Sequence, residues 1–306
     1  MMIIEDNFKI HLKESTYIAL GSFDGLHLGH MSLVNKVINL ARENDAKSMV
    51  FTFKDHPRSV INKNAGPRML MSNEMKLDVL KKAGLDIINM ASFDNDFMKI
   101  KPEDFVESLL EKYNAKGFVV GFNYKFGYKN MGNIDLMKKL SEKYNFSLDI
   151  ISPVKYEGKV VSSTLIRQII SETGDMTRAS KMLTRPFSIT GSVTYGKQLG
   201  KQLGFPTANL KMDQRFIIPR TGVYYTAVKV GGNFYKGITN VGFNPTTHDG
   251  KLSIETNILD FDKDIYGDKI EVCFIKRIRS EKKFDSLCDL KAQLEKDKKY
   301  AYTRRL

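Results

Sequence analysis

The sequence lacks tryptophan and has only two cysteines, Cys273 and Cys288, in 306 residues. Two cysteines are too few for a disulfide scaffold or a four-cysteine zinc site, and no metal-ligand spacing surrounds them. No apolar run approaches the roughly 18 residues of a membrane span, and the start MMIIEDNFKIHLKES has no secretory signal pattern. We therefore expect a cytoplasmic protein that neither crosses nor enters a membrane, with both cysteines in structural positions.

Length and charge narrow the possibilities further. A chain of 306 residues is about twice the usual length of one domain, so two hydrophobic cores are expected. The net charge of +13 favours anionic partners, which include nucleic acid, an acidic membrane surface and phosphorylated small molecules. Charge alone does not choose among them.

The first half of the chain alternates short β-rich runs with amphipathic helical stretches between Tyr17 and Val154. This alternation is typical of a parallel α/β sheet. The expected strands are YIALGSF (17–23), KSMVFTF (47–53), DIINMASF (86–93), GFVVGFN (117–123) and SLDIISPV (147–154).

The second half follows a different pattern. Residues 163–185 indicate two short helices that break near Thr173 and Gly174, and Pro186 then begins a glycine-rich series of short strands. A hairpin is expected around Gly231 and Gly232, and a helix over 284–300. We predict an α/β domain over 1–185, then a small antiparallel β-barrel with a terminal helix over 186–306.

The segment GSFDGLHLGH, residues 21–30, follows a hydrophobic strand and opens a helix. Backbone amides and the positive end of the helix dipole suit an anion at such a place. His27 and His30 offer two nitrogen donors to one phosphate, and Gly29 permits close approach of a ligand to the backbone. A metal-binding pair and a simple helix cap are the alternatives.

At these residues the sequence resembles the HxGH nucleotidyltransferases, and the longer form GxFDGxHxGH resembles their FAD synthetase branch. The resemblance implies a Rossmann-like domain in which the phosphate of FMN attacks the α-phosphorus of ATP and releases pyrophosphate. His27 and His30 would do the catalytic work. The other ATP- and FMN-binding residues it implies are Gly21, Phe23, Asp24, Gly29, Asn123, Ser163, Thr164 and Arg167.

Two further segments are similar to this branch. SSTLIR, residues 162–167, offers two hydroxyls beside a guanidinium at a helix start, which suits phosphate oxygens. VVGFNYKFG, residues 119–127, carries Asn123 where many members have aspartate, so hydrogen bonding is retained and the charge is lost. His56 stands in FKDHP, which departs from the common FxPHP, and we assign it no catalytic role.

The run GKQLGKQLGFPTAN, residues 196–209, spaces glycines and lysines as in a loop that wraps phosphates, although it is not a Walker A loop. In extended chain the side-chain oxygens of Thr207 and Asn209 face one side, where they are able to ligate Mg²⁺. The whole string resembles riboflavin kinase. That resemblance implies a kinase site for ATP and flavin at Gly196, Lys197, Gly200, Gly204, Pro206, Thr207, Asn209 and Arg279.

The resemblance continues through IETNILDFDKDIYG, residues 254–267, in which Glu255 matches the catalytic base of the riboflavin kinases. A strand glutamate is otherwise usually a solvent-facing residue. A glutamate beside a ribityl hydroxyl is able to accept its proton during transfer. Asn257 stands where a histidine is common, so we assign it no role.

Together the two resemblances cover nearly the whole chain and imply a bifunctional enzyme that converts riboflavin to FMN and then FMN to FAD. ATP and Mg²⁺ would serve both steps, and we expect no nucleic-acid or membrane partner. RNA-related adenylyl chemistry is one alternative, suggested by the HxGH signature and a pI near 9.4. A flavin-binding regulator with a decayed adenylyl site, suggested by Asn123, is another.

Overall fold

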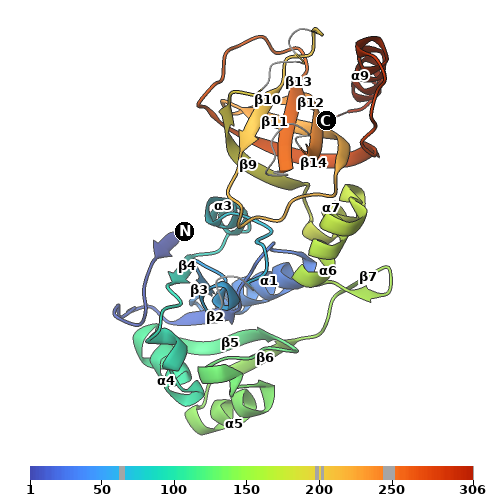
Figure 1. Ribbon diagram of the computed structural model, residues 1–306. Coiled ribbons are helices and arrows are strands. Elements are labelled where there is room, and N and C mark those ends of the chain that lie inside the picture. Colours follow the sequence, from blue (N-terminus) through green and yellow to red (C-terminus); the bar gives the residue numbers. More distant parts are fainter. Residues whose placement is uncertain (62–65, 197–199, 201–202, 244–251, 306) are drawn as a thin grey trace. The chain divides into compact units, whose positions relative to one another are not determined.

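The computed structural model describes residues 1–61, 66–196, 200, 203–243 and 252–305 (Figure 1). The chain divides into two compact units, Met1–Ser163 and Thr164–Leu306. The division between an α/β unit and a β unit matches the predicted fold class.

The first unit is built on a parallel sheet of six strands in the order β1-β4-β3-β2-β5-β6 (Figure 1). All five predicted strands are confirmed. The sixth, β1, was not predicted because it has three residues at the sheet edge, two of them exposed. The strands are β1 (Met2–Ile4), β2 (Thr16–Leu20), β3 (Lys47–Phe53), β4 (Ile87–Ala91), β5 (Ala115–Gly121) and β6 (Ser147–Ile151).

Helices cover both faces of this sheet because successive residues of the buried strands point to opposite sides. Tyr17 and Ala19 of β2 belong to the core formed with α1 (Leu28–Glu43) and α3 (Asn73–Lys82). Ile18 and Leu20 belong to the core formed with α4 and α5. The remaining elements of the unit include α2 (Pro57–Ile61), η1 (Phe97–Lys99), α4 (Pro102–Lys112), η2 (Tyr128–Asn130), α5 (Ile134–Tyr144), β7 (Lys155–Tyr156) and β8 (Lys159–Val160).

The strand order changes direction between β2 and β5. The chain runs from β2 outward through β3 to β4, and then returns to β5 on the other side of β2 before reaching β6. In open α/β sheets, ligands bind at the carboxyl ends of the strands at such a switch point. The topology therefore predicts a ligand site at the turns that follow Leu20 and Gly121.

The second unit begins with a helical segment made of α6 (Ser163–Gln168), the π-helical turn η3 (Ile169–Thr173) and α7 (Met176–Leu183). The predicted break near Thr173 is confirmed, because Gly174 adopts φ +70° and ends the first helical stretch. Helix α7 contacts β9 (Phe187–Thr194) and β14 (Lys269–Arg279) of the barrel that follows.

Six antiparallel strands close into a barrel in the order β10-β13-β12-β11-β14-β9. The predicted hairpin is confirmed, because Val230 pairs with Asn233 and the two glycines between them have positive φ. The strands and final helix are β9 (Phe187–Thr194), β10 (Ala208–Lys211), β11 (Gly222–Val230), β12 (Asn233–Phe243), β13 (Leu252–Ile258), β14 (Lys269–Arg279) and α9 (Leu287–Tyr302).

The two faces of the barrel differ in what they bury. Thr226, Thr239 and Thr256 are fully buried and form a hydrogen-bonded chain across three strands, with both O···O distances 2.9 Å. Because side chains alternate along a strand, their neighbours lie on the opposite face. There Tyr225 and Ile238 pack with Ala301 of α9, so the terminal helix covers part of the outer face.

Helix α7 is expected to be needed for any fragment of the second unit to fold by itself. Met176, Met182 and Leu183 of this helix are buried, and burying each such side chain contributes about 1.5–3 kcal/mol. Their sum is a large part of the roughly 5–15 kcal/mol that usually stabilises a domain. We therefore expect residues 164–306 to melt cooperatively in circular dichroism.

A fragment of residues 186–306, which begins at the boundary expected from the sequence, should by contrast be largely unfolded or aggregated, because the α7 face that contacts β9 and β14 is absent. Equal melting temperatures for the two fragments would show that α7 contributes nothing to the barrel.

Candidate active sites

The turn after β2 has an unusual backbone that fixes where its side chains lie. Phe23 and Leu26 have φ of +48° and +40°, and Gly25 between them has φ +89°. Left-handed backbone costs free energy in residues that carry side chains, so surrounding packing must hold it. Both side chains are fully buried, so the surrounding core supplies that packing. The turn held in this way leads directly to His27 at the start of α1.

His27 and His30 meet as predicted. Their rings stack with centroids 3.8 Å apart and an angle of 16° between their planes. His27 is the N-cap of α1, and its Nδ1 accepts the backbone N–H of His30 at 3.3 Å. The neutral His27 ring therefore carries its proton on Nε2, which is the ring atom that donates. The helix-cap alternative is thus part of the observed geometry of His27.

Gly29 permits this stacked arrangement. A β-carbon at this position would lie 3.3 Å from Cε1 and Nδ1 of His27 and 3.9 Å from the carbonyl oxygen of Val161. The first of these contacts is tighter than ordinary van der Waals contact, so a larger residue would press on the His27 ring. The glycine keeps the start of α1 close to the ring.

Asp24 and Ser163, which are 139 residues apart, are also brought together. The Ser163 hydroxyl donates to the Asp24 carbonyl oxygen at 2.9 Å, and an Asp24 carboxylate oxygen accepts the Leu70 N–H at 2.9 Å. Ser163 is thereby held against the turn after β2. Thr164 is exposed and Arg167 is half-buried on α6, and both belong to the second unit.

Asn123 lies in the turn that follows β5, the strand next to β2 at the switch point. Its side chain is exposed, two residues beyond the strand end at Gly121. Gly21, Phe23 and Asp24 lie in the turn after β2. The predicted adenylyl-site residues of the first unit therefore gather at the two turns of the switch point and at the start of α1.

One buried cation in this region was not predicted. Lys76 of α3 is only 5% exposed, and its Nζ donates to the Ser22 carbonyl in the turn after β2 at 3.3 Å. Burial lowers the pKa of this amine to about 8, against the attraction of Asp24 and Asp55. A lone lysine on an amphipathic helix normally indicates a solvent-facing position, so the sequence carries no signal for it.

The predicted kinase residues gather on the outer face of the barrel. Glu255 pairs with Asn209 of β10 on one side and with Asn240 of β12 on the other, and Asn209 pairs with Thr194 of β9. Directly opposite side chains on one face have β-carbons about 4.5–5.5 Å apart. The half-buried Glu255 carboxylate therefore has Asn209 as a direct neighbour, and Thr207 precedes Asn209 by two residues.

Two described glycines of the 196–209 segment, Gly196 and Gly200, lie close to neighbouring groups. A β-carbon on Gly196 would lie 2.0 Å from Nδ2 of Asn209, so only glycine lets the loop begin there. A β-carbon on Gly200 would lie 2.3 Å from the carbonyl oxygen of Phe205, which donates its own N–H to the Gly200 carbonyl at 2.7 Å. Gly204 has φ +85°. Lys197 lies outside the described residues.

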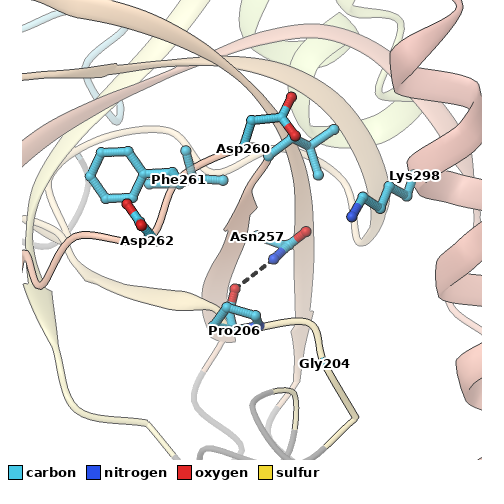
Figure 2. Close-up of a pocket in the computed structure, with 9 residues that line it drawn as sticks. Gly204, Pro206, Asn257, Asp260, Phe261, Asp262 and Lys298 are labelled. Atoms are coloured by element: carbon cyan, nitrogen blue, oxygen red, sulfur yellow. Dashed lines mark hydrogen bonds between the residues drawn. The ribbon is translucent and has the colours of Figure 1, made fainter.

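A cavity of about 430 Å³ lies beside the end of this loop (Figure 2). Asn257, to which no role was assigned from the sequence, donates to the Pro206 carbonyl at 2.6 Å and so ties β13 to the FPTAN segment. The opposite wall carries Asp260 and Asp262, and Lys298 of α9 lies at the side. The negative charge of the two carboxylates disfavours polyphosphate beside them, and Asp260 also accepts from the Tyr302 hydroxyl at 2.6 Å.

The side chain of Arg279 is paired with Asp297 of α9. Its Nε and Nη2 donate to the carboxylate of Asp297 on α9, at 3.1 Å and 2.7 Å to Oδ2, and Asp297 is 2% exposed. A bidentate pair with so buried a partner holds α9 on the barrel. In the geometry observed, Arg279 positions this helix.

Metal and membrane features are limited in the described part of the chain. No group of three or more His, Cys, Asp or Glu side chains among the described residues is arranged to hold a metal ion, which leaves the metal-pair alternative for His27 and His30 without a third such ligand there. Among the described helices, none has the length and hydropathy to span a membrane.

Cys273 is half-buried in β14, where burial raises its pKa to about 12.

Comparison with known proteins decides the family. A family model described as FAD synthetase matches residues 9–165, and one described as riboflavin kinase matches residues 183–304. The chain belongs to the bifunctional riboflavin kinase/FMN adenylyltransferase family. The relative from Bacillus subtilis is 33% identical over 93% of this chain and 90% of its own, and that from Escherichia coli is 32% identical over 93% and 91%. Both relatives carry that bifunctional name.

A solved structure matches the entire chain. It is a Streptococcus pneumoniae protein described as a macrolide-efflux protein, with a TM-score of 0.89, 30% identity and 99% of both chains covered. That description names a different activity, but the two family models match both halves of the present chain. This member of the family is therefore a riboflavin kinase and an FMN adenylyltransferase, with ATP as co-substrate and FMN and FAD as products.

Proposed function

We propose that riboflavin is phosphorylated on the outer face of the barrel and that FMN is adenylylated at the carboxyl edge of β2 and β5. The observation that carries the first assignment is the strand register that sets Glu255 beside Asn209, against the start of the glycine loop. The second is supported by the stacked His27 and His30 at the switch point of the sheet.

In the kinase step, Glu255 accepts the proton of the terminal ribityl hydroxyl as that oxygen bonds to the γ-phosphorus of ATP, and the bond from this phosphorus to ADP breaks. A carboxylate is able to act as a general base, and a positioned general base typically raises the reaction rate about 10²- to 10⁴-fold. We expect the glycines between residues 196 and 204 to let phosphate oxygens approach the backbone closely. The cavity beside Asn257 would receive an uncharged ring of a substrate.

We propose that Thr207 and Asn209 hold a magnesium ion, because side chains two residues apart in extended chain face one side and Mg²⁺ is bound through oxygen ligands together with substrate phosphates. When bound there, the ion would supply charge stabilisation to the β- and γ-phosphates. The close packing of Gly196 on Asn209 restricts the position of the Asn209 amide.

In the adenylyl step, a phosphate oxygen of FMN bonds to the α-phosphorus of ATP and pyrophosphate leaves. His27 Nε2–H and the His30 ring donate to phosphate oxygens, and the start of α1 adds the positive end of its dipole. Asn123 offers a neutral hydrogen-bonding group from the neighbouring turn. We also propose that Ser163, Thr164 and Arg167 bind phosphate oxygens as α6 begins.

Phosphorylated substrates account for the net charge of +13 without a nucleic-acid partner. We accordingly propose small-molecule partners alone, namely riboflavin, FMN and ATP, and a cytoplasmic location, where ATP is supplied.

Purified protein given riboflavin, ATP and Mg²⁺ should yield FMN and then FAD on product chromatography, and protein given FMN and ATP should yield FAD and pyrophosphate. Addition of excess EDTA should stop both reactions, because each uses ATP as its magnesium complex. Undiminished FMN formation in EDTA would contradict the proposal that Thr207 and Asn209 bind magnesium. Binding of riboflavin without any product would favour the flavin-binding regulator instead.

A further inference from the structure

A buried cation, Lys76, lies under the turn after β2, and neither reaction step described above uses it. Helix α3 places Lys76 between this turn and the end of β3. Its Nζ has three acceptors within hydrogen-bond reach, namely the Ser22 carbonyl at 3.3 Å, the Thr52 hydroxyl oxygen at 3.4 Å and the Phe53 carbonyl at 3.4 Å. An ammonium carries three protons, so each acceptor is matched by one donor.

The Ser22 carbonyl is the link from this cation to the adenylyl site. It accepts from both Lys76 and the Thr52 hydroxyl, the latter at 2.9 Å. The next residue along the chain is Phe23, the first of the left-handed residues that lead to His27. A backbone of this kind persists only where its surroundings hold it, and the anchored carbonyl is part of that support.

We propose that Lys76 is a positioning residue for FMN adenylylation, whose buried ammonium clamps the turn after β2 so that His27 and His30 are presented to phosphate. This inference rests on the proposed adenylyl site at those histidines. Lys76 does not touch the reacting atoms. Its charge also lies under an anion-binding turn, where a positive field favours polyphosphate.

The clamp depends on protonation. Lys76 is charged below a pH of about 8 and loses its charge above it, because burial lowers the pKa from the ordinary 10.5. Asp24 from the turn after β2 and Asp55 from the segment after β3 face it and oppose that lowering. Lys76 lines a small cavity together with Lys54 and His56, and Lys54 forms an ion pair with Glu5 at 2.6 Å. A neutral amine keeps two protons for three acceptors, so one hydrogen bond is lost.

The test is Lys76→Met, which keeps the length of the side chain and removes its donor. We expect kcat/KM for FAD formation from FMN and ATP to fall about 10- to 100-fold at pH 7, the range for one charge-assisted hydrogen bond. FMN formation by the same protein should be unchanged, which gives an internal control. Lys81→Met, an exposed lysine of the same helix, should behave as the unmodified protein.

The pH profile separates positioning by charge from a merely structural role. The unmodified protein should lose FAD-forming activity as pH rises through about 8, the pKa of Lys76, while FMN formation does not follow that fall. The alkaline fall should disappear in Lys76→Met. If the variant loses activity but keeps the same alkaline fall, the proposal is overturned, because another group then titrates.

Other outcomes are equally decisive. Full FAD formation in Lys76→Met, beside a large loss in His27→Ala with His30→Ala, would refute the clamp and leave the adenylyl site in place. Full activity in both would show that the adenylyl site itself lies elsewhere. Should Lys76→Met not fold, a flat profile from about pH 7 to about pH 10 in the unmodified protein would alone refute the proposal, since the charge of Lys76 is lost within that range.

Discussion

Glu255→Gln is expected to slow FMN formation by about 10²- to 10⁴-fold while FAD formation from supplied FMN continues at its normal rate. The amide has the size of the carboxylate and retains an acceptor oxygen, but it has almost no capacity to take a proton. The half-buried position in β13 should tolerate the change, since Glu255 lies on the outer face and the threonine chain of the interior is untouched. Stopped assays that separate riboflavin, FMN and FAD measure both steps in one sample.

The matched control is Glu295→Gln, the same chemical change at an exposed position on α9 in the same unit. It should leave both reactions as they are. Normal kinase turnover in Glu255→Gln would exclude the carboxylate as the base. A parallel loss in both variants would instead point to an effect of net charge.

The division of the chain into an α/β unit and a β-barrel was predictable because periodicity changes near Pro186 and because five strands were strongly apolar. The sequence predicts a boundary at Pro186, and the contacts within the structure divide the chain after Ser163. Helices α6 and α7 follow the α/β pattern in sequence, yet the face containing Met176 and Met182 is buried in the second unit. An amphipathic pattern indicates that one face of a helix is buried, but it does not indicate which unit that face packs against.

The candidate sites show the same limit at the level of residues. The contact of His27 with His30 was predictable, since the two residues are close in sequence and lie in a distinctive motif. The joint role of Thr207 and Asn209 stays a prediction. The neighbours Asn209 and Glu255 were separately predictable, but their adjacency depends on the register between β10 and β13. Lys76 and Asn257 act through backbone carbonyls of distant residues, Ser22 and Pro206, and no residue type in the sequence marks such a contact.

Arg279 makes a structural contact that the sequence did not predict. The resemblance implies that Arg279 belongs to the kinase site for ATP and flavin, and the structure shows its guanidinium paired with the buried carboxylate of Asp297. Because a buried carboxylate is costly to leave without its partner, this pair is expected to persist when substrates bind.

His27→Ala combined with His30→Ala is expected to produce the second large effect, with FAD formation slowed about 10²- to 10⁴-fold. Two hydrogen bonds to a charged phosphate are lost, each worth about 1.5–3 kcal/mol, and every 1.4 kcal/mol is about tenfold in rate. FMN formation should be unaffected, since every kinase residue proposed lies in the second unit. His11→Ala, an exposed histidine of the first unit, is the matched control.

The helix-cap role of His27 has to be separated from its role toward phosphate. His27 Nδ1 caps the His30 N–H, so alanine also removes a cap worth about 1 kcal/mol and should lower the melting temperature of the first unit. His27→Asn supplies a side-chain oxygen for the cap but no donor where Nε2–H stood. If phosphate binding is the function, this variant should melt close to the unmodified protein and still make FAD slowly. If it instead recovers FAD formation along with stability, the cap alone explains the histidine, and the proposed contact between His27 and phosphate is wrong.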